Sequence, residues 1–209
     1  MKPTEANVAA EGSVPRSASV RRATRETQIE VTLNLDGSGR AAIQTGVGFL
    51  DHMLDSLARH GLFDIRVHAT GDLHVDDHHT VEDVAITLGQ ALTQAIGDAR
   101  GIRRMGHAIV PMDEALALVA LDVSGRGVCD VDIPLDGPMV GGMKAQMVAH
   151  FFRSFALEAK ISLHVQVLKG VNDHHRVEAC FKALAKALDW ATQIDPRAPG
   201  EVPSTKGVL

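Results

Sequence analysis

The chain has 209 residues, a formal net charge of −5 at pH 7 and two cysteines. This length suits one large domain or two halves that share a core, and the negative charge argues against a nucleic-acid-binding protein. The cysteines, Cys129 and Cys180, form no CxxC pair, which argues against a zinc–thiolate site and fits a reduced, cytoplasmic setting. No apolar run approaches the ~20 residues that a membrane span needs, so we expect neither nucleic acid nor membrane among the partners.

Residues 1–20 show no apolar periodicity and lead into a basic, serine-bearing stretch, RSASVRRATR, at 16–25. Such a stretch is typical of a transit peptide, but the acids Glu5 and Glu11 favour a flexible N-terminal arm. We therefore expect residues 21–209 to form the folded domain.

Four elements are expected in the first half of this domain. They are a β-hairpin at 29–46, a helix at 48–61, a strand at 64–69 and a helix that opens at His78. The hairpin prediction depends on alternating apolar residues around Asp36-Gly37-Ser38-Gly39, a turn composition. The helix predictions depend on apolar residues at helical spacing, and Gly61 is a natural stop for the first helix.

The same four elements recur in the second half. They are a hairpin at 116–134 around Ser124-Gly125-Arg126-Gly127, a helix at 145–159, a strand at 160–165 and a helix that opens near His174. The acids just before the paired histidines are candidate N-caps for these helices. Because the repeat is longer than solenoid periods, we predict an internal duplication with an α+β fold, in which repeats at about 21–100 and 101–195 join near 97–111.

Six of the eleven histidines occupy equivalent places in the two halves, and two glutamates accompany them. The set is His52, His78, His79, Glu82, His150, His174, His175 and Glu178. Imidazole and carboxylate ligands without a thiolate suit Mn, Fe, Co, Ni or Zn, so the sequence predicts metal sites. His68 and His164 also match, but they lie on expected strands without a neighbouring carboxylate, and we interpret them as structural.

The spacing within each HHxxE segment limits what one segment can bind. Positions four apart share a helix face, so His78 can join Glu82 on one metal ion, and His174 can join Glu178 on another. The second histidine of each segment, His79 or His175, lies ~100° away round the helix and must serve a different ion. One segment therefore cannot close a site alone, and we expect sites at an interface, within the chain or between subunits.

Seven segments, taken in order, resemble the imidazoleglycerol-phosphate dehydratase family of histidine biosynthesis, in its monofunctional form. They are GVGFLDHMLDSLARHGLFD, DDHHTVEDVAITLGQAL, PMDEALA, LDVSGRG, HFFRSFA, NDHHRVEACFKALAKAL and PSTKG. The resemblance runs from about Arg22 to Lys206. It implies a duplicated α+β fold of the ribosomal protein S5 domain 2-like kind, each half a four-stranded sheet with helices on one face. It also implies a 24-subunit homo-oligomer with active sites shared between subunits and two Mn²⁺ ions per active site.

The activity that this resemblance implies is dehydration of D-erythro-imidazole glycerol phosphate, a small phosphorylated imidazole, to imidazole acetol phosphate and water. A metal ion on the imidazole nitrogen favours the imidazolate. The imidazolate can expel the hydroxyl through a diazafulvene-like intermediate, and loss of the C–H proton then gives an enol that becomes the ketone. These proton transfers need a positioned acid or base.

The resemblance also assigns roles to single residues. It makes the eight residues of the repeated set metal ligands, with catalytic roles for Glu26, His78, His79, His174 and His175. We group His78, Glu82, His150 and His175 on one ion, and His52, His79, His174 and Glu178 on the other, because this split obeys the pseudo-two-fold relation and the i, i+4 spacing.

A second set of residues matches the family's substrate-binding positions. They are Arg104, Arg126, Lys182, Ser204, Thr205 and Lys206 for the phosphate and Glu26 near the diol, with residues 196–209 as a substrate-binding tail. Guanidinium forks, ammonium groups and a hydroxyl donor suit a phosphate. The sequence alone leaves open whether Arg103 or its neighbour Arg104 contacts the phosphate.

Two other interpretations of the chain compete with this one. LDHM and DDHH superficially resemble segments of His-Asp phosphohydrolases, but the expected hairpins argue against their helical bundle. A non-catalytic metal-storage shell explains the histidine clusters but not the Ser-x-Lys tail. Some relatives carry a fused histidinol-phosphate phosphatase domain with a DxDx[TV] motif. The nearest string here, NLDGS at 34–38, has Asn34 in place of the nucleophile, so we predict no phosphatase activity.

Overall fold

The structure, a computed structural model, describes residues 16–209 of the chain. Its first half contains β1 (Ser17–Ala23), β2 (Thr27–Asn34), β3 (Ala41–Gln44), α1 (Gly48–Gly61), β4 (Asp64–Gly71) and α2 (His78–Ile96). Its second half contains β5 (Met105–Met112), β6 (Ala115–Asp122), β7 (Val128–Asp132), β8 (Met139–Val140), β9 (Met143–Lys144), α3 (Gln146–Glu158), β10 (Ser162–Lys169) and α4 (Asp173–Thr192). All four predicted helices are therefore confirmed.

The start of the folded part differs from the prediction. Residues 17–20, which we expected in a flexible arm, form the first part of β1 and pair with β2 in antiparallel register, with Val20 opposite Val31. Val20 is buried in the core, which gives this strand an apolar anchor. The remainder of the predicted arm, residues 1–15, lies outside the described residues.

The two predicted hairpins are wrong, because their strands are not neighbours. The first sheet has the order β1-β2-β4-β3 and the second has the order β5-β6-β10-β7. In each sheet the strand that follows the first helix inserts between the two strands that we expected to pair. β3 runs parallel to β4, and β7 runs parallel to β10, so each forms a parallel β-α-β unit across its helix. Within these two sheets, the hairpins that do form are β1–β2 and β5–β6.

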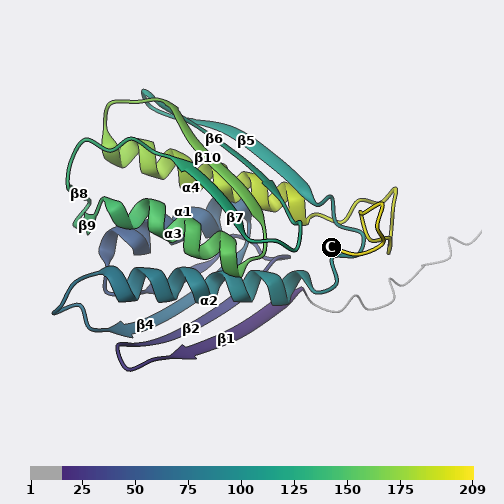
Figure 1. The fold of residues 1–209 in the computed structure, drawn as a ribbon, viewed down its shortest axis with the longest axis horizontal. Helices are drawn as coiled ribbons and strands as arrows, with labels where there is room; N and C mark the ends of the chain where they lie inside the picture. The colour runs from purple at the N-terminus through teal and green to yellow at the C-terminus, as the bar shows by residue number, and fades with distance from the viewer. Residues whose placement is uncertain (1–15) are drawn as a thin grey trace, which may run out of the picture.

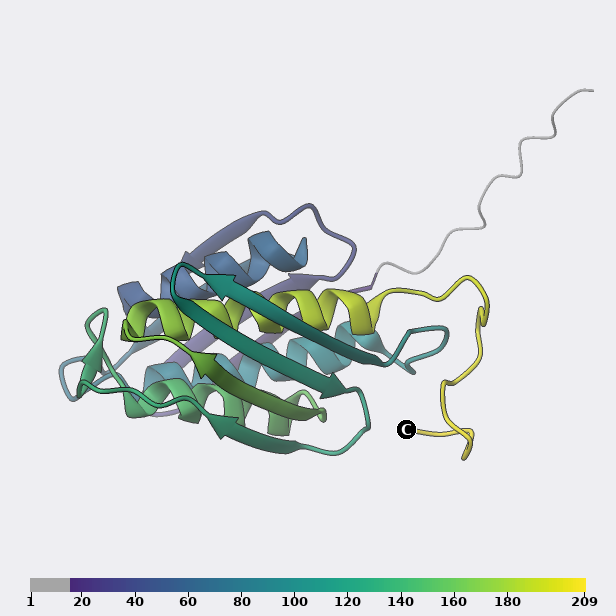
Figure 2. The same cartoon turned by 90° about the horizontal axis from the view of Figure 1, so that it is seen from above.

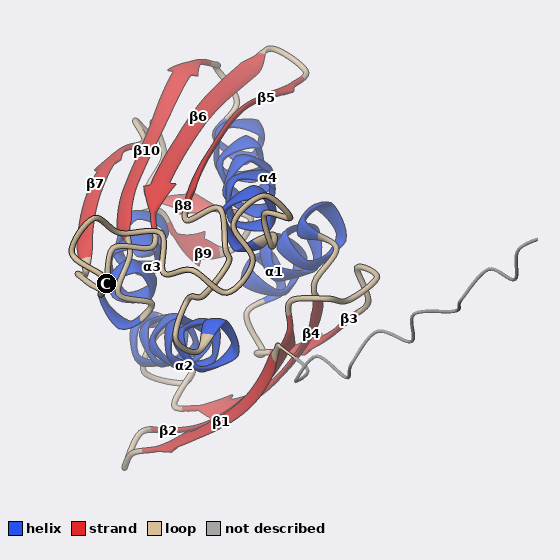
Figure 3. Cartoon of the chain, turned by 90° about the vertical axis from the view of Figure 1, so that its right-hand side faces the viewer, coloured by secondary structure: helices blue, strands red, loops and turns tan. Residues whose placement is uncertain are grey.

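The described residues are arranged in three layers, with four helices between two sheets (Figure 3). α2 packs on β1 and β2, and α4 packs on β5 and β6. The halves meet helix to helix, α1 against α4 and α2 against α3. Since each sheet alternates buried and exposed residues, its inner face joins one core with the apolar sides of the helices. The fold is thus the predicted duplicated α+β architecture.

The two helices that open with paired histidines begin at the same end of the molecule. Figures 1 and 2 show α2 and α4 running in the same direction along the long axis, from this end to the end where the C-terminal tail lies. α4 has 20 residues, which corresponds to ~30 Å of helix. We call the end that holds the starts of α2 and α4 the histidine end, and the opposite one the tail end. No helix of residues 16–209 is both long and apolar enough to cross a membrane.

The predicted N-caps are correct only in part. The Asp77 side chain makes no capping hydrogen bond; instead Asp76 Oδ1 accepts from the backbone N–H of His78 at 2.8 Å. At α4 the cap is Asn172, whose Oδ1 accepts from the N–H of His174 at 2.9 Å and of His175 at 3.3 Å. Asp173 lies inside the first turn of α4 and pairs with Arg176 at 2.9 Å.

Candidate metal centres and substrate-binding groups

The first candidate metal group lies between α2 and α3. His150 Nε2 is 3.0 Å from Glu82 Oε1, and His78 Nε2 is 3.8 Å from Glu82 Oε2. The potential ligand atoms of these three residues all lie within 4.8 Å of one another. The helical spacing of His78 and Glu82 directs both side chains to α3, which supplies His150.

The second candidate group lies between α1 and α4 and mirrors the first. Glu178 Oε2 is 3.2 Å from His52 Nε2 and 3.0 Å from His174 Nε2. These three ligand atoms also lie within 4.8 Å of one another. Each group contains three of the four residues that we had placed on one ion, and the structure does not bring the fourth to either group.

The donor atoms of both groups fit a divalent metal ion. Imidazole nitrogens and carboxylate oxygens bind such ions at ~2.0–2.2 Å, so two ligands on opposite sides of one ion are about 4.2 Å apart. A spacing of up to 4.8 Å needs only small side-chain rotations to reach that geometry. Three ligands leave coordination positions open for a residue from elsewhere or for substrate.

A lysine makes the two groups electrically different. Lys182 Nζ lies 2.8 Å from Glu178 Oε1, one helical turn further along α4, whereas the matching position after Glu82 is Ile86. Burial alone would raise the pKa of the Glu178 carboxyl, but the hydrogen bond and charge of Lys182, with smaller contributions from His174 and His52, leave this pKa below its usual value. Glu178 therefore remains a carboxylate beside a cation.

The second histidine of each HHxxE segment points away from these groups, as the helical angle predicts. His79 Nδ1 is 2.9 Å from Asp72 Oδ2, and His175 Nδ1 is 2.8 Å from Glu114 Oε2. These hydrogen bonds are the main reason that the pKa of each histidine is raised. The sequence analysis missed Asp72, which follows β4, and missed Glu114, which lies between β5 and β6. Only folding brings Glu114 to His175.

Glu26 lies at the histidine end, in the short turn between β1 and β2. The Thr24 hydroxyl accepts from the backbone N–H groups of Glu26 at 3.1 Å and Thr27 at 3.0 Å, which fixes the turn. Asp83 of α2 anchors both strands, because it accepts from Arg22 Nε at 2.7 Å and from the Thr27 hydroxyl. The Glu26 carboxylate is exposed and contributes to the raised pKa of His79.

Most of the predicted phosphate-binding groups lie at the tail end. Arg104 binds Asp122 through Nε at 2.6 Å and Nη2 at 2.9 Å, and its Nη1 donates to the Pro203 carbonyl at 2.7 Å. Arg103 instead stacks on Trp190, with its guanidinium carbon 3.8 Å from the ring centroid. The tail therefore lies against Arg104 and not against Arg103.

The C-terminal tail also reaches the turn that carries Arg126. Gly125 approaches Leu209 so closely that a Cβ on the glycine would lie 2.6 Å from the Leu209 carbonyl carbon. Arg126 is exposed, and its Nη1 donates to the Ser124 carbonyl at 3.2 Å. Ser204, Thr205 and Lys206 precede this contact, so they belong to the same end.

One chain thus does not bring its metal groups and its tail-end cations together. Arg104 N–H donates to the Ala191 carbonyl at 2.9 Å, near the end of α4, whereas His174 lies at the start of that helix. These two helical positions are 17 residues apart, which corresponds to about 25 Å. Lys182, the remaining member of the predicted phosphate set, lies midway along α4, beside Glu178 of the second metal group.

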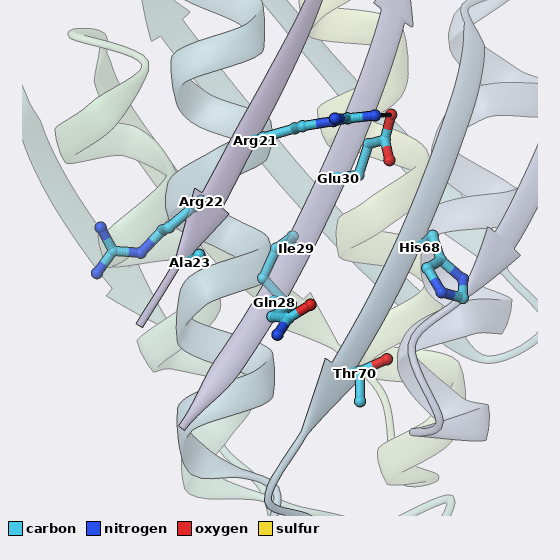
Figure 4. A pocket seen from close by; sticks show the side chains of 8 residues that line it. All are labelled: Arg21, Arg22, Ala23, Gln28, Ile29, Glu30, His68 and Thr70. Carbon is cyan, nitrogen blue, oxygen red and sulfur yellow. Dashed lines mark hydrogen bonds and ion pairs between the residues drawn. The ribbon is translucent and has the colours of Figure 1, made fainter. Parts of the chain in front are cut away.

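A separate hollow of about 390 Å³ lies on the outer face of the first sheet (Figure 4). Its rim includes Arg21, Glu30 and His68, and Arg21 Nη2 lies 3.0 Å from Glu30 Oε1. His68, which we interpreted as structural, is exposed there and not part of the core. None of the predicted site residues lines this hollow, so its position on the sheet does not connect it with the histidine groups.

Comparisons with known proteins show similarity to one family over most of the chain. The family model of imidazoleglycerol-phosphate dehydratase matches residues 45–188. The imidazoleglycerol-phosphate dehydratase of Roseiflexus sp. (strain RS-1) is 59% identical over 194 residues, which cover 93% of this chain and 98% of the relative. That of Chloroflexus aggregans (strain MD-66 / DSM 9485) is 57% identical over 194 residues, 93% of this chain and 95% of the relative.

Solved structures with the same fold carry the same family name. The crystal structure of imidazoleglycerol-phosphate dehydratase from Staphylococcus aureus subsp. aureus N315 has a TM-score of 0.78 at 35% identity and covers 86% of this chain and 99% of its own. That of the Pyrococcus furiosus protein in complex with (S)-C348 has a TM-score of 0.79 at 38% identity, with coverage of 91% and 100%. The chain therefore belongs to the imidazoleglycerol-phosphate dehydratase family, the dehydratases of histidine biosynthesis.

Proposed function

We propose that this enzyme converts D-erythro-imidazole glycerol phosphate to imidazole acetol phosphate and water in the cytoplasm, with two Mn²⁺ ions at each active site. The observation that carries the proposal is the pair of equivalent groups, each of two histidines and one glutamate whose ligand atoms lie within 4.8 Å. When bound, the ions would supply Lewis acidity that favours the imidazolate form of the substrate ring, the form from which a hydroxyl can leave.

The geometry of the two groups supports three ligands of each set. His78, Glu82 and His150 hold one ion, and His52, His174 and Glu178 hold the other. His175 and His79 are the fourth ligands of these two sets in our assignment. Within one chain they point away from the groups, so they reach ions held by other copies of the chain.

Glu26 is the residue that we assign to proton transfer near the substrate's diol. It is an exposed carboxylate on a turn that Asp83 ties to the start of α2. This tie fixes the turn beside the histidine end, where the reacting carbons would lie. The histidines of the HHxxE segments are His78, His79, His174 and His175. They would hold the ions, and the ions would orient the substrate ring.

The phosphate binds to Arg104, Arg126, Ser204, Thr205 and Lys206 of the tail end and to Lys182. The distance of about 25 Å along α4 exceeds the length of so small a substrate, so the phosphate groups of one chain act with the metal groups of another. This separation supports an active site shared between subunits, and the 24-subunit assembly of the family would provide it.

The experiment that tests the proposal is a metal-dependent assay of product formation. The purified protein is stripped with a chelator, and imidazole acetol phosphate is measured with and without added Mn²⁺. We expect activity only with Mn²⁺ in the wild type and at least a hundredfold lower activity in His78→Ala, because one ion loses a ligand. His68→Ala, which removes an exposed histidine outside both groups, is the matched control and should retain activity. Absence of product from a folded, Mn²⁺-loaded wild type would refute the proposal.

A further inference from the structure

Glu114 holds His175 through one carboxylate oxygen while its other oxygen is fixed by the backbone. Oε2 lies 2.8 Å from His175 Nδ1. Oε1 accepts from the backbone N–H groups of Asn172 at 2.8 Å and Val171 at 3.1 Å. These N–H groups belong to the loop just before α4, and Asn172 caps the same helix. The two oxygens of Glu114 therefore have different, fixed partners.

We infer that Glu114 is a positioning residue that selects the metal-binding tautomer of His175. This inference rests on the proposed role of His175 as a metal ligand. A neutral imidazole has one N–H and one lone pair, and an acceptor beside one nitrogen keeps the proton there. The Glu114 carboxylate thus holds the proton on Nδ1 and leaves the lone pair on Nε2, which points away from the carboxylate and can bind an ion of another subunit.

The surroundings of Nε2 agree with this direction. The nearest carboxylate that the described residues place there is Asp113, with Oδ2 at 3.6 Å. Its side chain is 73% exposed on the β5–β6 turn, so it can move aside when an ion approaches. Nε2 therefore faces an exposed carboxylate of a turn, whereas Nδ1 faces Glu114.

In the first half of the chain, the equivalent histidine is also held at Nδ1 by a carboxylate, but from a residue at a different place in the fold. His79 Nδ1 is held at 2.9 Å by Asp72, from the connection between β4 and α2. The other oxygen of Asp72, Oδ1, is buried without a hydrogen-bond partner in the described structure. Each of the two equivalent histidines thus has a carboxylate at Nδ1. Of these two carboxylates, only that of Glu114 accepts from backbone N–H groups through its second oxygen.

This difference gives Glu114→Gln an unusual predicted effect. The amide oxygen must face the N–H groups of Val171 and Asn172. In the alternative orientation the amide NH₂, a donor, would face these two N–H donors. The amide NH₂ then faces Nδ1 of His175, which must act as acceptor and carry its proton on Nε2. In serine proteases, replacing the aspartate of the catalytic triad by asparagine lowers activity through this same change of histidine tautomer. Glu114→Ala imposes no tautomer but loses the acceptor of both N–H groups.

The test compares Mn²⁺ affinity with thermal stability in the two Glu114 variants. Chelator-stripped protein is titrated with Mn²⁺, and free Mn²⁺ is measured by its electron paramagnetic resonance signal. We expect Glu114→Gln to lower the affinity of one class of sites 10–100-fold and Glu114→Ala to lower it less. Unfolding temperatures of the metal-free proteins should rank oppositely, with Glu114→Ala the less stable. Glu30→Gln, the same change on the outer sheet face, is the control and should match the wild type.

Each outcome has a distinct meaning. A purely structural role for Glu114 predicts that the alanine variant is worse in both measurements, and that result would overturn the inference while leaving the proposed function intact. Equal effects of the two Glu114 variants on affinity would also overturn it. If the wild type and Glu30→Gln bind no Mn²⁺, the metal-dependent function fails and the inference with it. In a His175→Ala background, the two Glu114 variants are expected to bind Mn²⁺ alike.

Discussion

Asp64 organises the connection between β2 and β3 through its two carboxylate oxygens. Oδ1 accepts from the backbone N–H groups of Ser38 at 2.8 Å and Arg40 at 3.0 Å, and Oδ2 lies 2.6 Å from Arg40 Nη2. The Arg40 side chain, followed by these N–H groups, holds the pKa of Asp64 well below its usual range. A carboxyl with a depressed folded pKa stabilises the fold above its unfolded pKa of ~3.9, and this contribution is lost as the pH falls further.

We therefore expect Asp64→Asn to lower the unfolding temperature of the metal-free protein at pH 7. The difference from the wild type should shrink steadily as the pH is lowered below ~4, because Asp64 of the unfolded wild-type chain then becomes protonated and folding must release that proton. Scanning calorimetry or circular dichroism from pH 7 to pH 3 measures it. Asp55→Asn, an exposed aspartate of α1, is the control. A difference that is the same at pH 3 and pH 7 would show that ionisation of Asp64 does not matter.

The candidate metal ligands show what a sequence reveals about single residues. The pairs His78–Glu82 and His174–Glu178 were predictable, because residues four apart on a helix share a face whatever the rest of the fold does. The duplication then indicated which other histidines belong with each pair. Glu114 was not predictable, since it lies far from His175 in the chain and has no pattern of its own. Residues that orient ligands depend on tertiary contacts.

The sheet order shows a similar limit for whole elements. Helical periodicity located all four helices, and apolar alternation located most of the strands. Alternation records which residues face the core but not which strand lies beside which. A six-residue connection, such as 35–40 between β2 and β3, is compatible with a hairpin and also with a gap that a later strand fills. β4 fills that gap between β2 and β3, because parallel strands joined through a helix, here β3 and β4, pair directly.

Close packing of β5 on α4 depends on a glycine in the strand. A Cβ at Gly106 would lie 2.1 Å from the Ala187 carbonyl oxygen, and helix backbone cannot move aside as a flexible side chain can. We expect Gly106→Ala to destabilise the fold by about 1–3 kcal/mol, with a clear decrease in unfolding temperature. Gly48→Ala is the matched control, because nothing lies within 4 Å of the position that its added methyl group would take, and it opens α1. An unchanged unfolding temperature in Gly106→Ala would mean that the sheet and α4 can separate slightly without cost.

At the scale of the whole molecule, the sequence indicated that one HHxxE segment could not complete a metal site. The structure adds a second reason for a shared active site, since the tail-end cations lie about 25 Å along α4 from the metal groups. The sequence could not supply this reason. It showed that Arg104, Arg126 and the Ser-x-Lys tail are cations and donors suited to phosphate, but their distance from the histidines depends on the direction in which α4 runs.

If active sites are shared in this way, two inactive variants should restore activity to each other. His78→Ala damages the histidine end, and Arg126→Ala damages the exposed cation of the tail end. In an assembly formed by coexpression, some sites combine the intact histidine end of one chain with the intact tail end of another, so product formation should return in the presence of Mn²⁺. A mixture of Arg126→Ala and Lys206→Ala, both altered at the tail end, is the matched control and should stay inactive. A site built wholly within one chain cannot be repaired by mixing, so a His78→Ala and Arg126→Ala assembly as inactive as either parent would contradict a shared site.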